Sequence, residues 1–150
     1  YGVFYPLQTF SKKQEVDFSL IPIFIEANNS RTENTLMNIA GRLSGRVFQI
    51  DSEQRSRVHL SAVFACNFVN RMYALADKEL EQSGLSFDVL LPLIDETARK
   101  VHALKPIDAQ TGPAVRFDRN IIDKQLKMLE KDPLTRDIYL KISESIHQND

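Results

Sequence analysis

The stretch that decides the fold is Leu60-Ser-Ala-Val-Phe-Ala-Cys-Asn-Phe-Val-Asn-Arg-Met-Tyr-Ala-Leu-Ala76, which is apolar on nearly every side of a helix. Asp51 or Ser52 offers an N-cap before it and Gly84 a stop after it, so we predict one helix about 45 Å long. A helix that is apolar all round is enclosed by other structure or buried in a subunit interface. We therefore predict a mainly α protein, a helical bundle around this long central helix, and an oligomer.

A shorter helix is predicted before the central one. Ser30-Arg-Thr-Glu33 has the spacing of a capping box, in which the hydroxyl and the carboxylate satisfy each other's backbone amides. Gly45 would supply the left-handed residue that ends this helix. Val47-Phe-Gln-Ile50 then follows as a short candidate strand.

Three more helices are predicted after the central one. Ser86 caps the first, and Pro92 kinks or splits it. Asp118 caps the second, and Asp132-Pro133 begins the third with a cap directly before a proline. The apolar faces expected for the last two helices are Ile121, Ile122, Leu126 and Leu129, and Leu134, Ile138, Ile142 and Ile146.

Residues 1–27 have the pattern of strand and loop. Val3-Phe-Tyr5 is short and apolar and ends at Pro6, and residues 18–25 are β-branched and aromatic. Because Pro22 cannot donate to a ladder, residues 18–25 should form an edge strand or two short strands. One strand followed only by helices makes no sheet of its own, so we expect a partner sheet from an upstream part of the protein.

The composition excludes several classes of function. The 19 basic and 20 acidic residues are interspersed and leave a net charge of −1, so neither nucleic acid nor a membrane surface is expected as a partner. A single cysteine, Cys66, excludes an intrachain disulfide and is expected to be a buried, unreactive thiol. No apolar run approaches the roughly 20 residues of a membrane span. We expect a cytoplasmic protein that continues upstream of Tyr1, because the chain begins with neither an initiator Met nor a signal peptide.

A stripe of polar residues runs along the central helix. At 100° per residue its members fall within about 120° of one another. Either other side chains satisfy them, or they face a ligand in a cleft. His59 is the best single candidate because its charge changes near neutral pH, and the paired donor and acceptor of Asn67 suit a carbonyl or an amide. No histidine or carboxylate stands three or four residues after His59, so no metal site is predicted. The stripe consists of Arg55, His59, Asn67 and Asn70.

Two loops are further candidates. Gln110-Thr-Gly-Pro-Ala-Val-Arg116 either connects two helices, with Arg116 paired to a nearby acid, or presents its guanidinium to a carboxylate or phosphate. Tyr5-Pro-Leu-Gln-Thr-Phe-Ser11 follows a short strand, where open α/β sheets place ligands. The sequence contains no GxGxxG, GxSxG or HExxH motif, so nothing in it predicts that it binds a nucleotide unaided.

Taken in order, these segments resemble a family of uncharacterised Rossmann-like proteins classed as oxidoreductases. The resemblance covers essentially the whole chain and is carried by residues 5–11, by His59 and residues 65–69 on the long helix, by Leu90-Leu-Pro-Leu-Ile94 and by residues 110–116. Such proteins join an N-terminal NAD(P)-binding domain to a helical domain of the 6-phosphogluconate dehydrogenase C-terminal type. Their wider superfamily includes pyrroline-5-carboxylate reductases and deazaflavin-dependent NADP reductases. The resemblance implies that residues 1–27 are the tail of the Rossmann domain and residues 28–150 the helical substrate and dimerisation domain.

The resemblance also implies roles for individual residues. His59 and Asn67 would be the catalytic candidates facing the nicotinamide cleft, and NADP or NAD would be bound mainly by the N-terminal domain. Many relatives are expected to have glycine after the arginine, whereas this chain has Phe117, which leaves the path of that loop open. The other residues implied near substrate or cofactor are Gln8, Asn70, Gln110, Thr111, Gly112, Pro113 and Arg116.

Two functions from different classes follow. In the first, the chain is the substrate-side and dimerisation domain of an NAD(P)-dependent oxidoreductase, inactive by itself, with its Rossmann domain, a second copy and a small-molecule substrate as partners. In the second, it is a non-catalytic helical interaction module of a Rossmann-like sensor or scaffold, which the apolar helix and the lack of a strong catalytic pair would suit. The substrate and the direction of the reaction stay open. The preference for NAD or NADP also stays open, because the residue that selects the cofactor would lie in the N-terminal domain.

Overall fold

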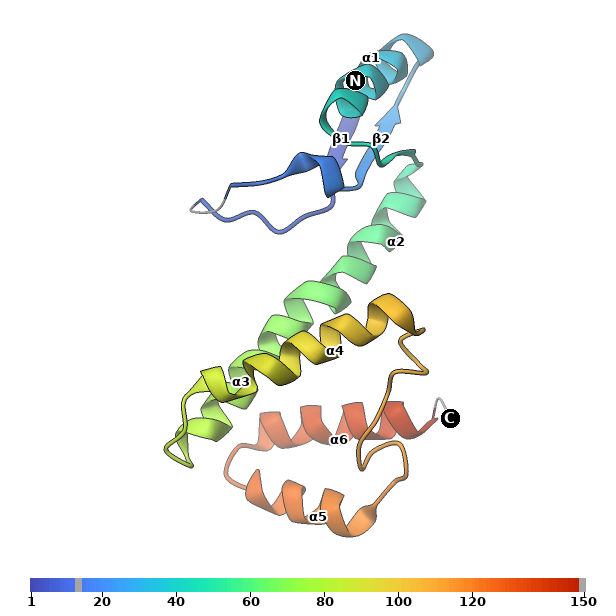
Figure 1. Ribbon diagram of the computed structural model, residues 1–150. Helices are drawn as coiled ribbons and strands as arrows, with labels where there is room; N and C mark the ends of the chain where they lie inside the picture. The colour runs from blue at the N-terminus through green and yellow to red at the C-terminus, as the bar shows by residue number, and fades with distance from the viewer. Residues whose placement is uncertain (13–14, 149–150) are drawn as a thin grey trace. The chain divides into compact units, whose positions relative to one another are not determined.

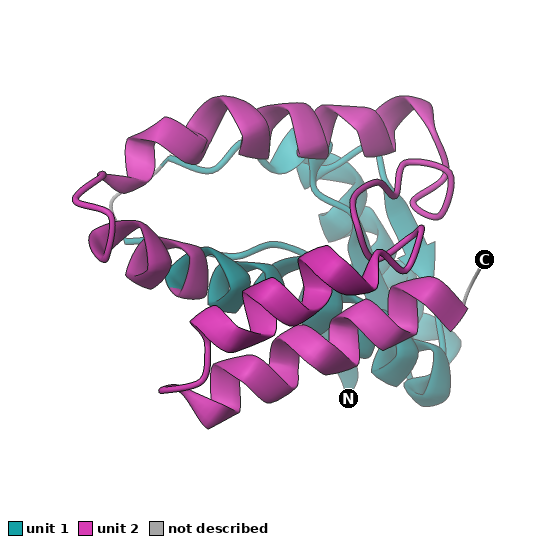
Figure 2. Cartoon of the chain, turned by 90° about the horizontal axis from the view of Figure 1, so that it is seen from below, with its two compact units in different colours: residues 1–74 teal, residues 75–150 magenta. Residues whose placement is uncertain are grey.

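The computed structural model (Figure 1) describes residues 1–12 and 15–148, and it is mainly helical with a three-stranded sheet near the N-terminus. This confirms the predicted fold class. The chain divides into two compact units, an N-terminal unit Tyr1–Ala74 and a C-terminal unit Leu75–Asp150 (Figure 2), and each is described by itself. The domain boundary at residue 27 stays a prediction.

The sheet has the order β1-β2-β3, and its strands are Gly2–Pro6, Ile23–Ala27 and Val47–Gln49. Strand β1 pairs antiparallel with β2, with Gly2 opposite Ala27, and β2 pairs parallel with β3, with Ile23 opposite Val47. The strands therefore do form a sheet of their own, and the expectation that they would not is wrong. The sheet forms because a third strand, β3, follows the connecting helix and pairs parallel with β2.

Strand β2 lies in the middle of this sheet, so the prediction of an edge strand is also wrong. Pro22 stands one residue before the strand begins, where its missing N–H removes no ladder bond. Its carbonyl instead accepts a hydrogen bond from the Leu7 amide, at 2.9 Å. The preceding residues, Phe18–Leu20, form a 3₁₀ turn.

Helix α1, Ser30–Leu43, packs on the sheet and closes a small core. Ile23 and Ile25 of β2 are fully buried, and Ala40 covers them from the helix. Burying an isoleucine side chain contributes about 1.5–3 kcal/mol. The residues packed around this core are Phe4, Leu36 and Val47.

The ends of α1 differ from the prediction. Its N-cap is Asn29, whose side chain accepts from the Thr32 amide at 2.9 Å, because Asn29 has the extended backbone of a cap and Ser30 is already helical. The helix ends in extended backbone at Ser44, and Gly45 is not left-handed. The reason is tertiary: the buried Ser44 hydroxyl donates to the Ile21 carbonyl, at 2.6 Å, and draws the chain back to the sheet.

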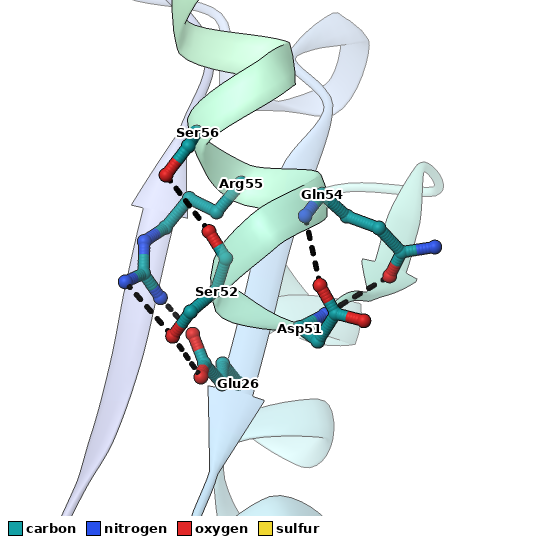
Figure 3. A network of polar contacts seen from close by, with 6 residues as sticks. All are labelled: Glu26, Asp51, Ser52, Gln54, Arg55 and Ser56. Carbon is teal, nitrogen blue, oxygen red and sulfur yellow. Dashed lines mark hydrogen bonds and ion pairs between the residues drawn. The ribbon is translucent and has the colours of Figure 1, made fainter.

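The long helix begins where the sequence predicted. The Asp51 carboxylate accepts a hydrogen bond from the Gln54 backbone amide at 2.8 Å, and the Gln54 side-chain oxygen accepts one from the Asp51 backbone amide at 3.0 Å. These two bonds make a capping box (Figure 3). Gly84 is left-handed (φ 72°) after the helix, as predicted. A π-helical segment, which was not predicted, separates its two α-helical parts. The two α-helical parts are α2, Ser52–Ala62, and α3, Val69–Glu81, and the π segment between them is Val63–Phe68.

The apolar side chains of this helix are not all covered. Leu60 is 57% exposed and Phe64 61% exposed, and the rings of Phe64 and Phe68 meet edge to face at 5.1 Å. Their burial against a second copy stays a prediction. No helix among the described residues is long and apolar enough to cross a membrane.

Three more α-helices lie in the described part of the C-terminal unit, and two of their three predicted caps are confirmed, those at Asp118 and Asp132. Ser86 instead precedes a 3₁₀ turn without a side-chain cap bond, and the N-cap of α4 is Leu90, so the predicted Ser86 cap is wrong. Pro92 lies in the first turn of α4, after a 3₁₀ turn over Phe87–Leu90, so it does split the predicted helix. The Asp118 and Asp132 carboxylates accept backbone amides at the starts of α5 and α6. The bounds are Leu91–Ala103 for α4, Arg119–Met128 for α5 and Pro133–Gln148 for α6.

The buried face of α6 is not the predicted apolar stripe. Leu134 and Ile142 are exposed, whereas Thr135 and Ser143 are buried. Between them in the i, i+4 series, the Tyr139 hydroxyl donates to the Gln125 carbonyl oxygen on α5, at 2.5 Å. The prediction is therefore wrong for Leu134 and Ile142, whereas Ile138 and Ile146 of the predicted face are half-buried. On α5 the prediction holds for Ile122, Leu126 and Leu129, while Ile121 is 41% exposed.

We predict that Gly2→Ala destabilises the protein by about 1–3 kcal/mol, because a Cβ here would overpack the site. It would lie 2.7 Å from Leu36 Cδ1 and 2.8 Å from the Glu26 carbonyl oxygen. Gly41→Ala is the matched control, since nothing lies within 4 Å of its Cβ position and alanine favours α1 by up to about 1 kcal/mol. Thermal and urea unfolding of the full-length protein would measure both. Equal stability of the two variants would contradict this account of the contact between α1 and β1.

A second prediction concerns acid stability. The Lys78 ammonium, 2.6 Å from the carboxylate, holds the pKa of Asp132 far below its ordinary value, and Thr135 adds two hydrogen bonds. A carboxyl group with a lowered folded pKa stabilises the fold above its unfolded pKa of about 3.9 and loses this effect as the pH falls. Asp132→Asn should therefore lower the melting temperature at pH 7, and the difference should shrink below about pH 4. Lys78→Gln should weaken the same pH dependence, and an unchanged dependence would rule out the ion pair as its cause.

Candidate functional site

The candidate site of the N-terminal unit depends on how α2 is attached to the sheet. The Glu26 carboxylate on β2 accepts from the Ser52 hydroxyl at 2.6 Å and from the Arg55 guanidinium (Figure 3). Arg55 also reaches the Ser52 hydroxyl, and the Ser56 hydroxyl donates to the Ser52 carbonyl oxygen at 2.9 Å. Charge-assisted bonds of this kind are roughly twice as strong as neutral ones. They hold the first turns of α2 on the sheet, and they show that Arg55 is satisfied inside the chain.

One turn after Arg55, His59 lies next to the end of β1. The Tyr5 hydroxyl and His59 Nδ1 are 3.2 Å apart, and the two ring centroids are 6.3 Å apart. The tautomer decides which of the two donates. In either case Nδ1 is engaged by Tyr5, so Nε2 is the ring atom left for a ligand. Tyr5 was not among the predicted site residues, although it is the first residue of the predicted loop motif.

Gln8, His59 and Asn67, which the sequence predicted for one site, are brought together by the structure. They share a cavity of about 370 Å³. Strand β1 and the loop after it supply one wall, and the long helix supplies the other. The lining residues are Tyr5, Leu7, Gln8, Thr9, His59, Ala62, Ala65, Cys66 and Asn67.

The π segment helps to bring Asn67 to this cavity. A π turn holds more residues than an α turn, so it advances by less than 100° per residue. Asn67 follows His59 by eight positions, which at α spacing would place it about 80° away around the helix. The π turn reduces this offset. Asn70 is not among the lining residues, and its amide nitrogen lies 4.0 Å from Cys66 Sγ.

The lining of this cavity is mainly apolar and carries the polar side chains of Tyr5, Gln8, Thr9, His59 and Asn67. Two side-chain amides, an imidazole and two hydroxyls face a space otherwise lined by small apolar side chains. Such groups can hydrogen-bond a carbonyl, an imine or a carboxamide. Among the residues that the structure describes, no lysine or arginine lines this cavity. Among the described residues, no three His, Cys, Asp or Glu side chains are grouped to hold a metal ion.

A second cavity, of about 470 Å³, shares Tyr5 and His59 with the first. Among its described lining residues, Arg55 and His59 are the basic ones. Because Glu26 neutralises Arg55, this cavity carries no free cation from that side chain. Its other lining residues are Val3, Phe4 and Ser56.

The predicted loop of residues 110–116 lies in the C-terminal unit, so its place in a shared cleft stays a prediction. Gly112 is left-handed (φ 107°), and Phe117, where a glycine was expected in relatives, is left-handed too (φ 46°). The Asp118 amide donates to the Pro113 carbonyl at 2.9 Å, and the Gln110 amide group donates to the Thr111 carbonyl at 3.4 Å. Arg116 is exposed and has no hydrogen-bond or ion-pair partner in the part of the chain that the structure describes. The alternative in which Arg116 pairs with a nearby acid is therefore not seen.

Comparison with known proteins identifies the family. The model of DUF2520, a domain of unknown function, matches residues 21–146. The chain belongs to the DUF2520 family. No curated protein matches this DUF2520 chain.

Two solved structures resemble this DUF2520 chain. A crystal structure of a "putative NADP oxidoreductase" from Bacteroides fragilis is 58% identical, with a TM-score of 0.95 over 99% of this chain and 57% of that one. A protein from Thermotoga maritima is 25% identical, with a TM-score of 0.79 over 98% of this chain and 60% of that one. The DUF2520 chain thus spans less than two thirds of either solved chain.

Proposed function

We propose that this chain is the C-terminal part of an NAD(P)-dependent oxidoreductase, where it forms the substrate side of the nicotinamide cleft. The observation that carries the proposal is the cavity in which Gln8, Asn67 and the Tyr5–His59 pair meet. The description of the Bacteroides fragilis neighbour as a "putative NADP oxidoreductase" supports it. The helical part would then be of the 6-phosphogluconate dehydrogenase C-terminal type, and the Rossmann domain would lie in the part of the protein upstream of this chain.

The residues present fit one end of such a cofactor. Side-chain amides at Gln8 and Asn67 match the carboxamide of a nicotinamide ring or the polar group of a substrate. Among the described residues the lining holds no lysine or arginine, and in this proposal the Rossmann domain binds the phosphates at a helix N-terminus. With its phosphates on the Rossmann domain and its nicotinamide end at this cavity, NADP or NAD would supply or accept the hydride.

In this proposal His59 moves a proton. As an imidazolium it donates Nδ1–H to the Tyr5 oxygen and Nε2–H to the oxygen of a substrate carbonyl. When the carbonyl carbon is reduced, the Nε2 proton passes to the oxygen, and the ring is left neutral with its proton on Nδ1. In the opposite direction the neutral ring accepts a proton at Nε2. Tyr5 orients the ring, Asn67 orients the substrate, and Arg116 contacts its anionic group.

We predict that His59→Ala in the full-length protein lowers kcat by about 10²–10⁴-fold, as expected for loss of a general acid or base. Asn67→Ala should mainly raise KM, because it removes a substrate contact. NADPH affinity should stay near that of the wild type, since the phosphates bind elsewhere. NADPH oxidation with a panel of carbonyl and imine compounds, together with NADPH fluorescence titration, would measure these effects.

The matched controls for these variants are His102→Ala and Asn120→Ala, which change the same residue types on exposed positions of α4 and α5. Both should turn over normally. Wild-type kinetics for both His59→Ala and Asn67→Ala would rule out this site.

A second candidate function is a non-catalytic interaction module of a Rossmann-like sensor or scaffold. The exposed apolar side chains of the long helix favour it. Titration of the full-length protein with NADPH and NADH separates the two functions, because failure to bind either nucleotide would favour the module.

Both functions include a homodimer formed through the long helix. Leu60, Phe64 and Phe68 follow one another at four-residue spacing and would form the centre of its interface. We predict that the full-length protein sediments as a dimer at micromolar concentration and that Phe64→Glu shifts it to monomer. Leu20→Glu, at a similarly exposed position in the 3₁₀ turn, should leave the dimer intact. A monomeric wild type would contradict the proposal.

A further inference from the structure

The backbone of Phe117 has a conformation that its side chain disfavours. Its φ of 46° lies in the left-handed region, which glycine and asparagine enter readily and a bulky residue rarely does. Such a conformation costs free energy and persists only where the surrounding structure holds it. Contacts around Phe117 must therefore hold its backbone in this conformation.

Two side chains hold the ring. The imidazole of His147, near the end of α6, stacks on it with 4.4 Å between centroids and 15° between planes. The guanidinium carbon of Arg119, the first residue of α5, lies 5.0 Å from the ring centroid. Stacking and cation–π contacts both favour this arrangement. We call Phe117, Arg119 and His147 the aromatic clamp.

The clamp acts on the loop before it. The Phe117 amide donates to the Ala114 carbonyl at 3.1 Å, and the Asp118 amide closes a wider turn onto Pro113. The two ring contacts and these two hydrogen bonds together restrict the backbone of the turn. Arg116 is the residue directly before the anchor, and its exposed guanidinium has no partner among the described residues. Packing of the Phe117 ring between His147 and Arg119 does not by itself require a left-handed backbone at this residue.

We propose that Phe117 is a positioning residue, whose clamped ring holds the loop of residues 111–117 in one conformation so that Arg116 presents its guanidinium to an oxyanion of the ligand. The ligand group is a carboxylate or a phosphate, the two anions that a guanidinium binds with paired hydrogen bonds. This inference rests on the proposed function for Arg116, but the state of the loop can be measured separately.

The test is made on the full-length protein with ¹⁵N-labelled arginine. Arg116→Lys identifies the Arg116 Nε–H signal, which is then titrated with sodium acetate and with sodium phosphate at constant ionic strength. Phe117→Tyr keeps the ring and should behave as the wild type. Phe117→Gly keeps the left-handed backbone without the ring, and it should weaken anion binding about tenfold, as loss of one well-placed hydrogen bond would. The stronger of the two wild-type responses assigns a carboxylate or a phosphate.

Amide hydrogen exchange provides the second measurement. Residues 111–117 should exchange about tenfold faster in Phe117→Gly and in His147→Ala, which removes the stack from the other side, while α5 and α6 keep their protection. Unchanged exchange and anion affinity in both variants would overturn the proposal. If the wild-type Arg116 signal responds to neither anion but the variants still loosen the loop, the clamp stands and the anion contact in the proposed function fails.

Discussion

The contact on which the rest of the N-terminal unit depends is that of the Glu26 carboxylate with Ser52 and Arg55. A sheet of three short strands has little surface with which to orient a long helix, and this charge-assisted network on β2 does so at the first turn of α2. Because the helix is fixed there, the position of His59 one turn later follows from helical geometry. The Tyr5–His59 contact and the cavity beside it are consequences of that attachment.

Two of the candidate functional residues, Asn67 and Arg116, stand where regular structure is interrupted. The π segment turns Asn67 toward the side of the helix that carries His59, and the left-handed Phe117 ends the loop that carries Arg116. Both features depart from the local backbone geometry of lowest free energy, so the surrounding structure must hold them. Departures of this kind concentrate at functional sites, because local propensity is given up there for a required geometry.

The chemistry of the cavity also suggests which parts of the DUF2520 protein would bind the different groups of the substrate and cofactor. Among the described residues its lining offers amides, hydroxyls and one imidazole, and these groups can hydrogen-bond a neutral reacting group. Arg116, a cationic side chain without a hydrogen-bond or ion-pair partner among the described residues, lies on a loop of the C-terminal unit. In the proposed oxidoreductase the reacting group, the substrate anion and the cofactor phosphates would therefore be held by different parts of the protein. This division would let one cofactor-binding domain serve different substrates.

The sequence by itself determined the helical class and most helix ends, because caps such as Asp51, Asp118 and Asp132 depend on residues within four positions. Together with the family resemblance it also singled out Gln8, His59 and Asn67. Only the tertiary structure decided that β2 is central, that α6 turns Thr135 and Ser143 inward, and that Tyr5 contacts His59, 54 residues away. These features depend on contacts between distant segments, and no periodicity within one segment encodes which partner its face will meet.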